Sequence, residues 1–234
     1  MSSPAAGQPR ATHYSVWFVV IVASFVTCLV AANIVSVKLI SLHGLILPAG
    51  IVIFPISYII GDVLTEVYGY GQARRVIWLG FACNLLAVAA IAIAQALPAA
   101  GFWDGQDAFD RILGAAPRLL LASFVAYLAG EFANAYVLAK MKIATRGRWL
   151  WTRTIGSTLV GQALDSAVFI TLAFAGIIPV GGLVTAIVTQ WLVKTAYETL
   201  ATPLTYLVVG FLKRREQLDV YDRDTRFNPL LVAD

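Results

Sequence analysis

Six long apolar runs constrain the fold of this chain more than any other feature of its sequence. They occupy residues 14–32, 45–68, 76–97, 119–139, 155–178 and 183–212. Each is near or above the roughly 20 residues that an α-helix needs to cross a bilayer, whereas the strands of a membrane barrel are short and alternating. The chain is 59% hydrophobic and 13% charged, where a soluble domain is about 25% charged. We therefore predict an all-α integral membrane protein with six transmembrane helices.

Lysine and arginine are unevenly distributed between the predicted loops. Six crossings would place 13 of the 17 basic residues on one side of the membrane. These are Arg10, Arg74, Arg75, Lys140, Lys142, Arg146, Arg148, Arg153, Lys213, Arg214, Arg215, Arg223 and Arg226. Basic loops face the cytoplasm, so we expect both termini to be cytoplasmic in a bacterial inner membrane. We divide the chain into a flexible tail (1–13), a transmembrane domain (14–212) and a cytoplasmic C-terminal tail (213–234).

A weak internal similarity relates the two halves of the chain. Ala-Asn followed by a lysine occurs at 32–38 and again at 133–140, and an aspartate follows in each half, at Asp62 and Asp165. Three helices per half would give a 3+3 inverted repeat, the plan of many transporters whose site lies near the membrane midplane. Matches this short also arise by chance, so both interpretations stay open.

Ionisable residues interrupt the apolar runs at six positions. They are Asp62, Glu66, Glu131, Asp165, Lys194 and Glu198. Each costs about 2.5–3.5 kcal/mol at the centre of a membrane helix, and ionisable groups inside a membrane are functional-site candidates by default. We therefore expect these side chains to face the interior of the bundle.

Helical spacing places these residues beside one another or beside amides. Asp62 and Glu66 share a face at a spacing of four, and Glu66 either joins the site or pairs with Arg74 or Arg75 at the membrane boundary. The remaining groups are the pairs Glu131 and Asn134, Gln162 and Asp165, and Lys194 and Glu198, with Gln190 and Trp191 beside the last pair. Lys194 and Glu198 either neutralise each other or join the site, and amides alone more often pack helices.

The predicted interior holds more acid than base, which suits a cation, a coupled proton or a neutral ligand rich in N–H donors. Ionised carboxylates only accept hydrogen bonds. The two cysteines lie within apolar runs, and no Cys/His cluster is present, so we expect neither a metal nor a cofactor. HExxH, GxSxG and P-loop motifs are also missing from the sequence, so we expect no enzyme and no ATPase domain.

Several motifs resemble one known family. "FPISYIIGDVLTEVYGYGQARRVIW", "GSTLVGQALDS", "KTAYETLATPLTYLV" and "DVYDRDTRFNP" are similar to the queuosine precursor transporter family, also called the vitamin uptake transporter family. The resemblance implies a six-helix inner-membrane transporter. It would import 7-deazaguanine precursors of queuosine, in cyano and aminomethyl forms, for tRNA modification salvage.

The resemblance and the polar pattern together define the expected site. We expect the substrate to be bound by Asn33, Asp62, Glu66, Glu131, Asn134, Gln162, Asp165, Gln190, Trp191, Lys194 and Glu198. We expect gating or structural roles for Lys38, Tyr68, Arg74 and Arg75. The expected partners are the small-molecule substrate, membrane lipid and a second copy in a homodimer, with no nucleic acid. The alternative is a membrane-embedded binding subunit for another vitamin-like heterocycle, which would need an energising partner.

Overall fold

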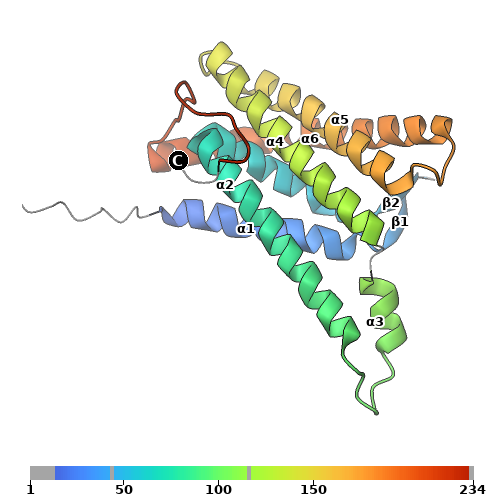
Figure 1. The fold of residues 1–234 in the computed structure, drawn as a ribbon. Helices are drawn as coiled ribbons and strands as arrows, with labels where there is room; N and C mark the ends of the chain where they lie inside the picture. Colours follow the sequence, from blue (N-terminus) through green and yellow to red (C-terminus); the bar gives the residue numbers. More distant parts are fainter. Residues whose placement is uncertain (1–13, 43–44, 115–116, 232–234) are drawn as a thin grey trace, which may run out of the picture.

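The computed structural model describes residues 14–42, 45–114 and 117–231, which are mostly helical. In chain order the elements are α1 (Val16–Val35), β1 (Leu39–Leu42), β2 (Leu45–Pro48), the 3-10 helix η1 (Ala49–Val52), α2 (Phe54–Ala96), α3 (Gln106–Leu113), α4 (Pro117–Ala144), α5 (Leu150–Phe174) and α6 (Val180–Glu216). The long helices pack on one another, and the segment after α6 folds back over α2 (Figure 1).

Among the described residues, four helical stretches are long and apolar enough to cross a membrane. Three are Val16–Val35, Phe54–Ala96 and Leu150–Phe174, and the fourth lies within Gln106–Ala144, which includes α4. α6 has 37 residues but is the least apolar of the long helices. The chain is therefore a multi-pass membrane protein, and the number of crossings depends on how α2 and α6 are counted.

α2 contains both the second and the third predicted helices, and Gly69 interrupts it. The Gly69 backbone has φ 83° and ψ 166°, a conformation that only glycine adopts readily. A Cβ at this position would also lie 2.7 Å from Cγ1 of Val220. The second half of α2 runs from this break toward α3 (Figure 1), so the element consists of two helical segments joined at a rigid corner.

The expectation of a purely helical chain misses a short hairpin between α1 and α2. β1 and β2 pair antiparallel, with Leu39 opposite Pro48, and η1 follows directly. The helix therefore begins at Phe54 and not at residue 45. Pro48, the last residue of β2, lacks the N–H that the interior of a helix requires. Pro55 is accommodated because it lies in the first turn of α2.

The helices α4 and α5 approach each other closely. A Cβ on Gly130 would lie 3.1 Å from the carbonyl oxygen of Gly161, and a Cβ on Gly161 would lie 2.8 Å from Cβ of Asn134. Small residues allow membrane helices to pack backbone against backbone. This contact brings the polar faces of α4 and α5 together in the interior of the bundle.

Candidate functional site

Four carboxylates from four different helices lie buried in the bundle. They are Asp62 on α2, Glu131 on α4, Asp165 on α5 and Glu198 on α6, with exposed fractions of 5%, 1%, 5% and 7%. Together with Asn134, Gln162 and Lys194, we call them the central cluster. The apolar surfaces of the helices face outward around it, and many of their large apolar side chains are exposed, as a lipid environment requires.

Three of the four carboxylates have polar partners. Asn134 Nδ2 donates to Asp62 Oδ1 at 2.7 Å. Glu198 accepts hydrogen bonds from Thr158, at 2.7 Å, and from Gln162. These bonds join α2 to α4 and α5 to α6 through side chains that the sequence places at helical spacing.

Asp165 forms an ion pair with Lys194. The sequence left two roles open for Lys194, neutralisation by Glu198 one helical turn away or membership of the site. The Lys194 ammonium also lies 4.6 Å from the ring centroid of Phe54, within the range of a cation–π contact. Lys194 is thus held between α5 and the start of α2.

Several buried polar atoms of this region have no hydrogen-bond partner among the described residues. They are Tyr58 Oη, Glu131 Oε1, Asn134 Oδ1, Gln162 Oε1, Ser166 Oγ and Thr195 Oγ1. Three are acceptors only, and three are hydroxyls. Buried polar groups are nearly always hydrogen-bonded, so this arrangement is suited to a ligand, or waters, that supply N–H or O–H donors.

Seven of the predicted binding residues therefore meet in the central cluster, and four do not: Glu66, Asn33, Gln190 and Trp191. Asn33 and Gln190 are only half-buried. The indole N–H of Trp191 donates to the backbone carbonyl of Leu159 at 3.0 Å. The ring is therefore fixed against α5 by its polar edge.

Glu66 lies outside the central cluster, in a separate group of charges. Arg153 Nη2 and Lys213 Nζ each lie 2.7 Å from Glu66 Oε1, and Lys142 Nζ lies 3.9 Å away. The Glu66 side chain is fully buried. The sequence suggested Arg74 or Arg75 as its cationic partners, but these three ion pairs come from α4, α5 and α6.

Asp219 completes what we call the Glu66 cluster, which comprises Glu66, Lys142, Arg153, Lys213 and Asp219. Its Oδ1 lies 2.6 Å from Lys142 Nζ and 2.8 Å from Lys213 Nζ. Burial alone would raise the pKa of Asp219, but the hydrogen bonds from Lys142 and Lys213 outweigh it and lower that pKa below its usual value. Sequence reasoning missed four members of this cluster, because the three cations appeared only in the basic bias of the predicted loops and Asp219 only in the motif "DVYDRDTRFNP".

The segment 217–231 packs against the break in α2. Asp222 is 3% exposed, and its two carboxylate oxygens accept from the amide of Tyr70 at 3.0 and 3.1 Å. Lys142 Nζ donates to the carbonyl oxygens of Glu66 and Val220, both at 2.6 Å. Asp222 was not among the predicted site residues, although it belongs to the motif "DVYDRDTRFNP".

The four residues expected to act in gating lie in different surroundings. Arg74 is buried, and its Nη1 donates to the carbonyl oxygens of Arg226 and Asn228 at 2.9 Å. Tyr68 is buried and stacks edge-on against Phe18, whereas Arg75 is half-buried. Lys38 is exposed in the turn before β1. Arg74 therefore fastens the C-terminal segment to α2.

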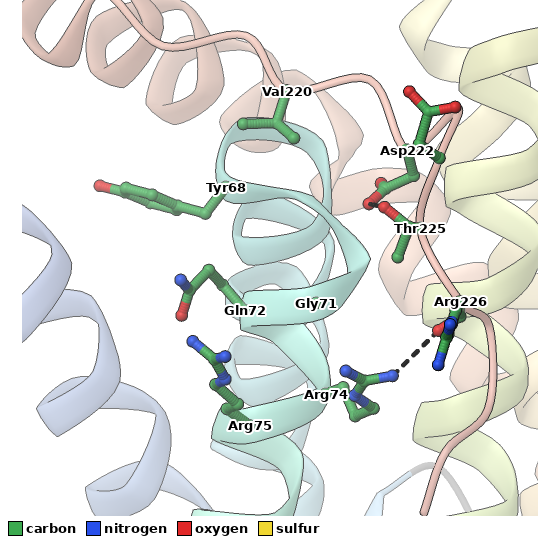
Figure 2. Close-up of a pocket in the computed structure, with 10 residues that line it drawn as sticks. Tyr68, Gly71, Gln72, Arg74, Arg75, Val220, Asp222, Thr225 and Arg226 are labelled. Carbon is green, nitrogen blue, oxygen red and sulfur yellow. Dashed lines mark hydrogen bonds between the residues drawn. The ribbon is translucent and has the colours of Figure 1, made fainter. Parts of the chain in front are cut away.

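A cavity of about 510 Å³ lies beside the break in α2. It is lined by Tyr68, Gly71, Gln72, Arg74, Arg75, Val220, Asp222, Asp224, Thr225 and Arg226. In Figure 2, Gln72 and Arg75 point to one side of α2, and Arg74 and Arg226 point to the other. The lining residues belong to the docked C-terminal segment and α2, and none belongs to the central cluster.

Among the described residues, no three His, Cys, Asp or Glu side chains are placed to hold a metal ion. The carboxylates of the central cluster come from separate helices and are spaced by amides and a lysine. This arrangement can bind a ligand rich in hydrogen-bond donors inside the helical bundle. A multi-pass fold with a polar site buried between helices is characteristic of membrane carriers.

Comparison with known proteins identifies the family. The family described as "Putative vitamin uptake transporter" matches residues 48–208. The chain is 32% identical over 189 residues to the "Probable queuosine precursor transporter" of Bacillus subtilis (strain 168), a match covering 80% of this chain and 82% of that protein. It is 29% identical over 121 residues to the "Queuosine precursor transporter" of Escherichia coli (strain K12), covering 52% of each. No solved structure matches the chain.

The chain therefore belongs to the vitamin uptake transporter family. This family comprises transporters and not enzymes. The match confirms the family resemblance found in the sequence. The family match covers the central cluster completely, from Asp62 to Glu198.

Proposed function

We propose that this protein imports queuosine precursors across the bacterial inner membrane, as 7-deazaguanines in their cyano and aminomethyl forms, and that it binds them in the central cluster. The names of two relatives support the substrate class. The observation that carries the assignment of the site is the set of buried acceptors without donors, among them Glu131 Oε1 and Gln162 Oε1.

The chemistry of a deazaguanine fits this acceptor set. Its guanine-like edge offers a ring N–H and an exocyclic amine, which one carboxylate can accept together, as acids accept from exocyclic base amines. Its keto oxygen needs a donor, and Lys194 lies in the cluster. The amide of Asn134 already donates to Asp62, so its free carbonyl oxygen remains for the ligand.

We further propose six membrane crossings, with α2 counted as two segments on either side of Gly69 and α6 as the sixth. Lys142, Arg153 and Lys213 gather in the Glu66 cluster, which supports placing them on one side. We place that side, with both termini, in the cytoplasm. The 3+3 inverted repeat and the homodimer remain predictions.

Binding and transport by the purified protein test the proposed function. We expect saturable binding of labelled aminomethyl-deazaguanine in detergent, and uptake after reconstitution into liposomes. The Glu198→Gln substitution keeps the shape of the side chain but replaces a carboxylate with a neutral amide. It should therefore weaken ligand binding about 10- to 100-fold. Asp107→Asn changes an exposed acid on α3 and should leave binding unchanged.

The outcomes separate the proposed carrier from its alternative. Binding without uptake would mean that the protein is a binding subunit that needs an energising partner. An absence of binding by the wild-type protein would refute the proposed substrate class. Equal binding by the Glu198→Gln variant and the wild type would exclude a role for Glu198 in binding.

A further inference from the structure

The charges of the central cluster do not balance. Four carboxylates share the buried region with one cation, Lys194. The titratable groups that interact electrostatically with the Glu131 carboxyl are Tyr127 from α4, Tyr58 and Asp62 from α2, Asp165 from α5 and Glu198 from α6. Because neighbouring carboxylates repel and burial disfavours the charged form, such a group holds at least one proton when it is empty.

Glu131 is the carboxylate with the least compensation. Asp165 has the Lys194 ammonium, Glu198 has two donors, and Asp62 has the amide of Asn134. In contrast, Glu131 Oε1 is buried with no hydrogen-bond partner in the described part of the chain, and the whole residue is 1% exposed. The proton of the empty site therefore belongs on Glu131.

The other oxygen of Glu131 is held close to α2. A Cβ built on Gly61 would lie 3.0 Å from Glu131 Oε2, so the absence of a side chain at Gly61 makes room for this carboxyl. Asp62, the neighbour of Gly61, accepts from Asn134, one turn after Glu131 on α4. The carboxyl thus lies where α2, α4 and the unpaired acceptors meet.

We propose that Glu131 holds a proton in the empty site and releases it to water when a positively charged, N–H-rich ligand binds. The N–H groups of the ligand then donate to the carboxylate, and the positive charge of the ligand replaces that of the proton. This exchange keeps the net charge of the buried cluster constant, which avoids burying an additional anion. The inference rests on the proposed function and adds to it, for the positively charged aminomethyl form, an exchange of one proton for one cationic ligand.

Proton release during binding tests the exchange. Purified full-length protein in weakly buffered detergent, with a pH indicator, is titrated with aminomethyl-deazaguanine. We expect the release of about one proton per bound ligand, and an affinity that rises up to about tenfold per pH unit over the range where Glu131 is protonated. Glu131→Gln should abolish both effects, and the surface control Asp107→Asn should retain both.

A measurement on the wild-type protein alone keeps the test decisive if the Glu131→Gln variant does not fold. Infrared spectra of the empty wild-type protein should contain the carbonyl band of a protonated carboxyl, and the band should disappear when the ligand is added. Saturable binding without proton release, or with an unchanged band, would overturn the exchange and leave the proposed function intact. An absence of binding would overturn both.

Discussion

Glu66 and Glu131 are both buried glutamates, but they differ in how their charge is compensated. Glu66 has Arg153 and Lys213 at 2.7 Å, whereas one oxygen of Glu131 has no partner among the described residues. A buried carboxylate surrounded by cations is stabilised in its ionised form. We therefore assign a structural role to Glu66 and a ligand-responsive role to Glu131.

Removing Arg153 should destabilise the protein strongly. Arg153 is 1% exposed, and removing one partner of a buried ion pair costs about 3–5 kcal/mol, because it leaves the other charge uncompensated. Lys142 and Lys213 remain near Glu66, so we expect Arg153→Ala to fall at the lower end of this range. Thermal unfolding in detergent measures the effect. Arg214→Ala, an exposed arginine near the end of α6, is the control, and an equal loss in both variants would contradict a role for the buried pair.

The Asp219 carboxylate should make stability depend on acidic pH. Its folded pKa is lowered, so its stabilising contribution is fully present above the unfolded pKa of about 3.9 and is lost as the pH falls through the folded pKa. The Tm of the wild-type protein should therefore exceed that of Asp219→Asn at neutral pH, and the difference should disappear in strong acid. A difference that stays constant with pH would exclude this ionisation as its source.

At the scale of elements, three glycines determine where the helices lie. Gly69 allows α2 to break within its length, and Gly130 and Gly161 allow α4 to approach α5. The break at Gly69 places the C-terminal segment against α2. The close approach of α4 to α5 places Glu131 and Asn134 opposite Gln162 and Asp165. The central cluster therefore depends on backbone positions that carry no functional group.

A methyl group at Gly161 should separate α4 from α5. A Cβ there would lie 2.8 Å from Cβ of Asn134 and 3.0 Å from the carbonyl oxygen of Gly130, and overpacking of this kind costs about 1–3 kcal/mol. We expect Gly161→Ala to lower the Tm and weaken ligand binding together. Gly210→Ala is the matched control, since nothing lies within 4 Å of a Cβ at that helical position. The contact would be unimportant if the two variants behaved alike.

At the scale of the whole molecule, the Glu66 cluster and the docked segment 217–231 lie at one end of the bundle, and Arg118 marks the other. Arg118 donates to the carbonyl oxygens of Leu172 and Ala175, at 2.7 and 2.6 Å, where α5 ends. This difference between the two ends of the bundle agrees with the uneven distribution of basic residues along the chain. It is the basis of the proposed orientation in the membrane.

Cysteine labelling in intact cells tests that orientation. In a background with Cys28→Ala and Cys83→Ala, a cysteine at Asp224 should react only with a membrane-permeant reagent. A cysteine at Asp107, in α3, should also react with an impermeant one. Both positions are exposed, so accessibility depends on the side of the membrane. Labelling of both positions by the impermeant reagent would contradict the proposed number of crossings.

The polar residues of the site could be predicted from the sequence, because the free-energy cost of a charged group in the bilayer depends on its position in an apolar run and not on the fold. An acid such as Glu131 within an apolar run must face the interior, whatever the fold, and a spacing of three places Asn134 beside it. Arg153 could not be found in this way, since a basic residue at a predicted membrane boundary looks like an ordinary interfacial charge. The break at Gly69 could not be predicted from the sequence either, because it depends on the residues that pack against it, here Asp222 and Val220.

The docking of segment 217–231 has a consequence for biosynthesis. Lys142 and Tyr70 leave the ribosome long before Asp219 and Asp222 do, so in a nascent chain the buried ammonium and the amide after Gly69 lack those acceptors. This end of the bundle can close only after segment 217–231 has left the ribosome. A chain truncated before Asp219 would therefore insert its helices without these acceptors, which would expose it to the proteases that degrade misfolded membrane proteins.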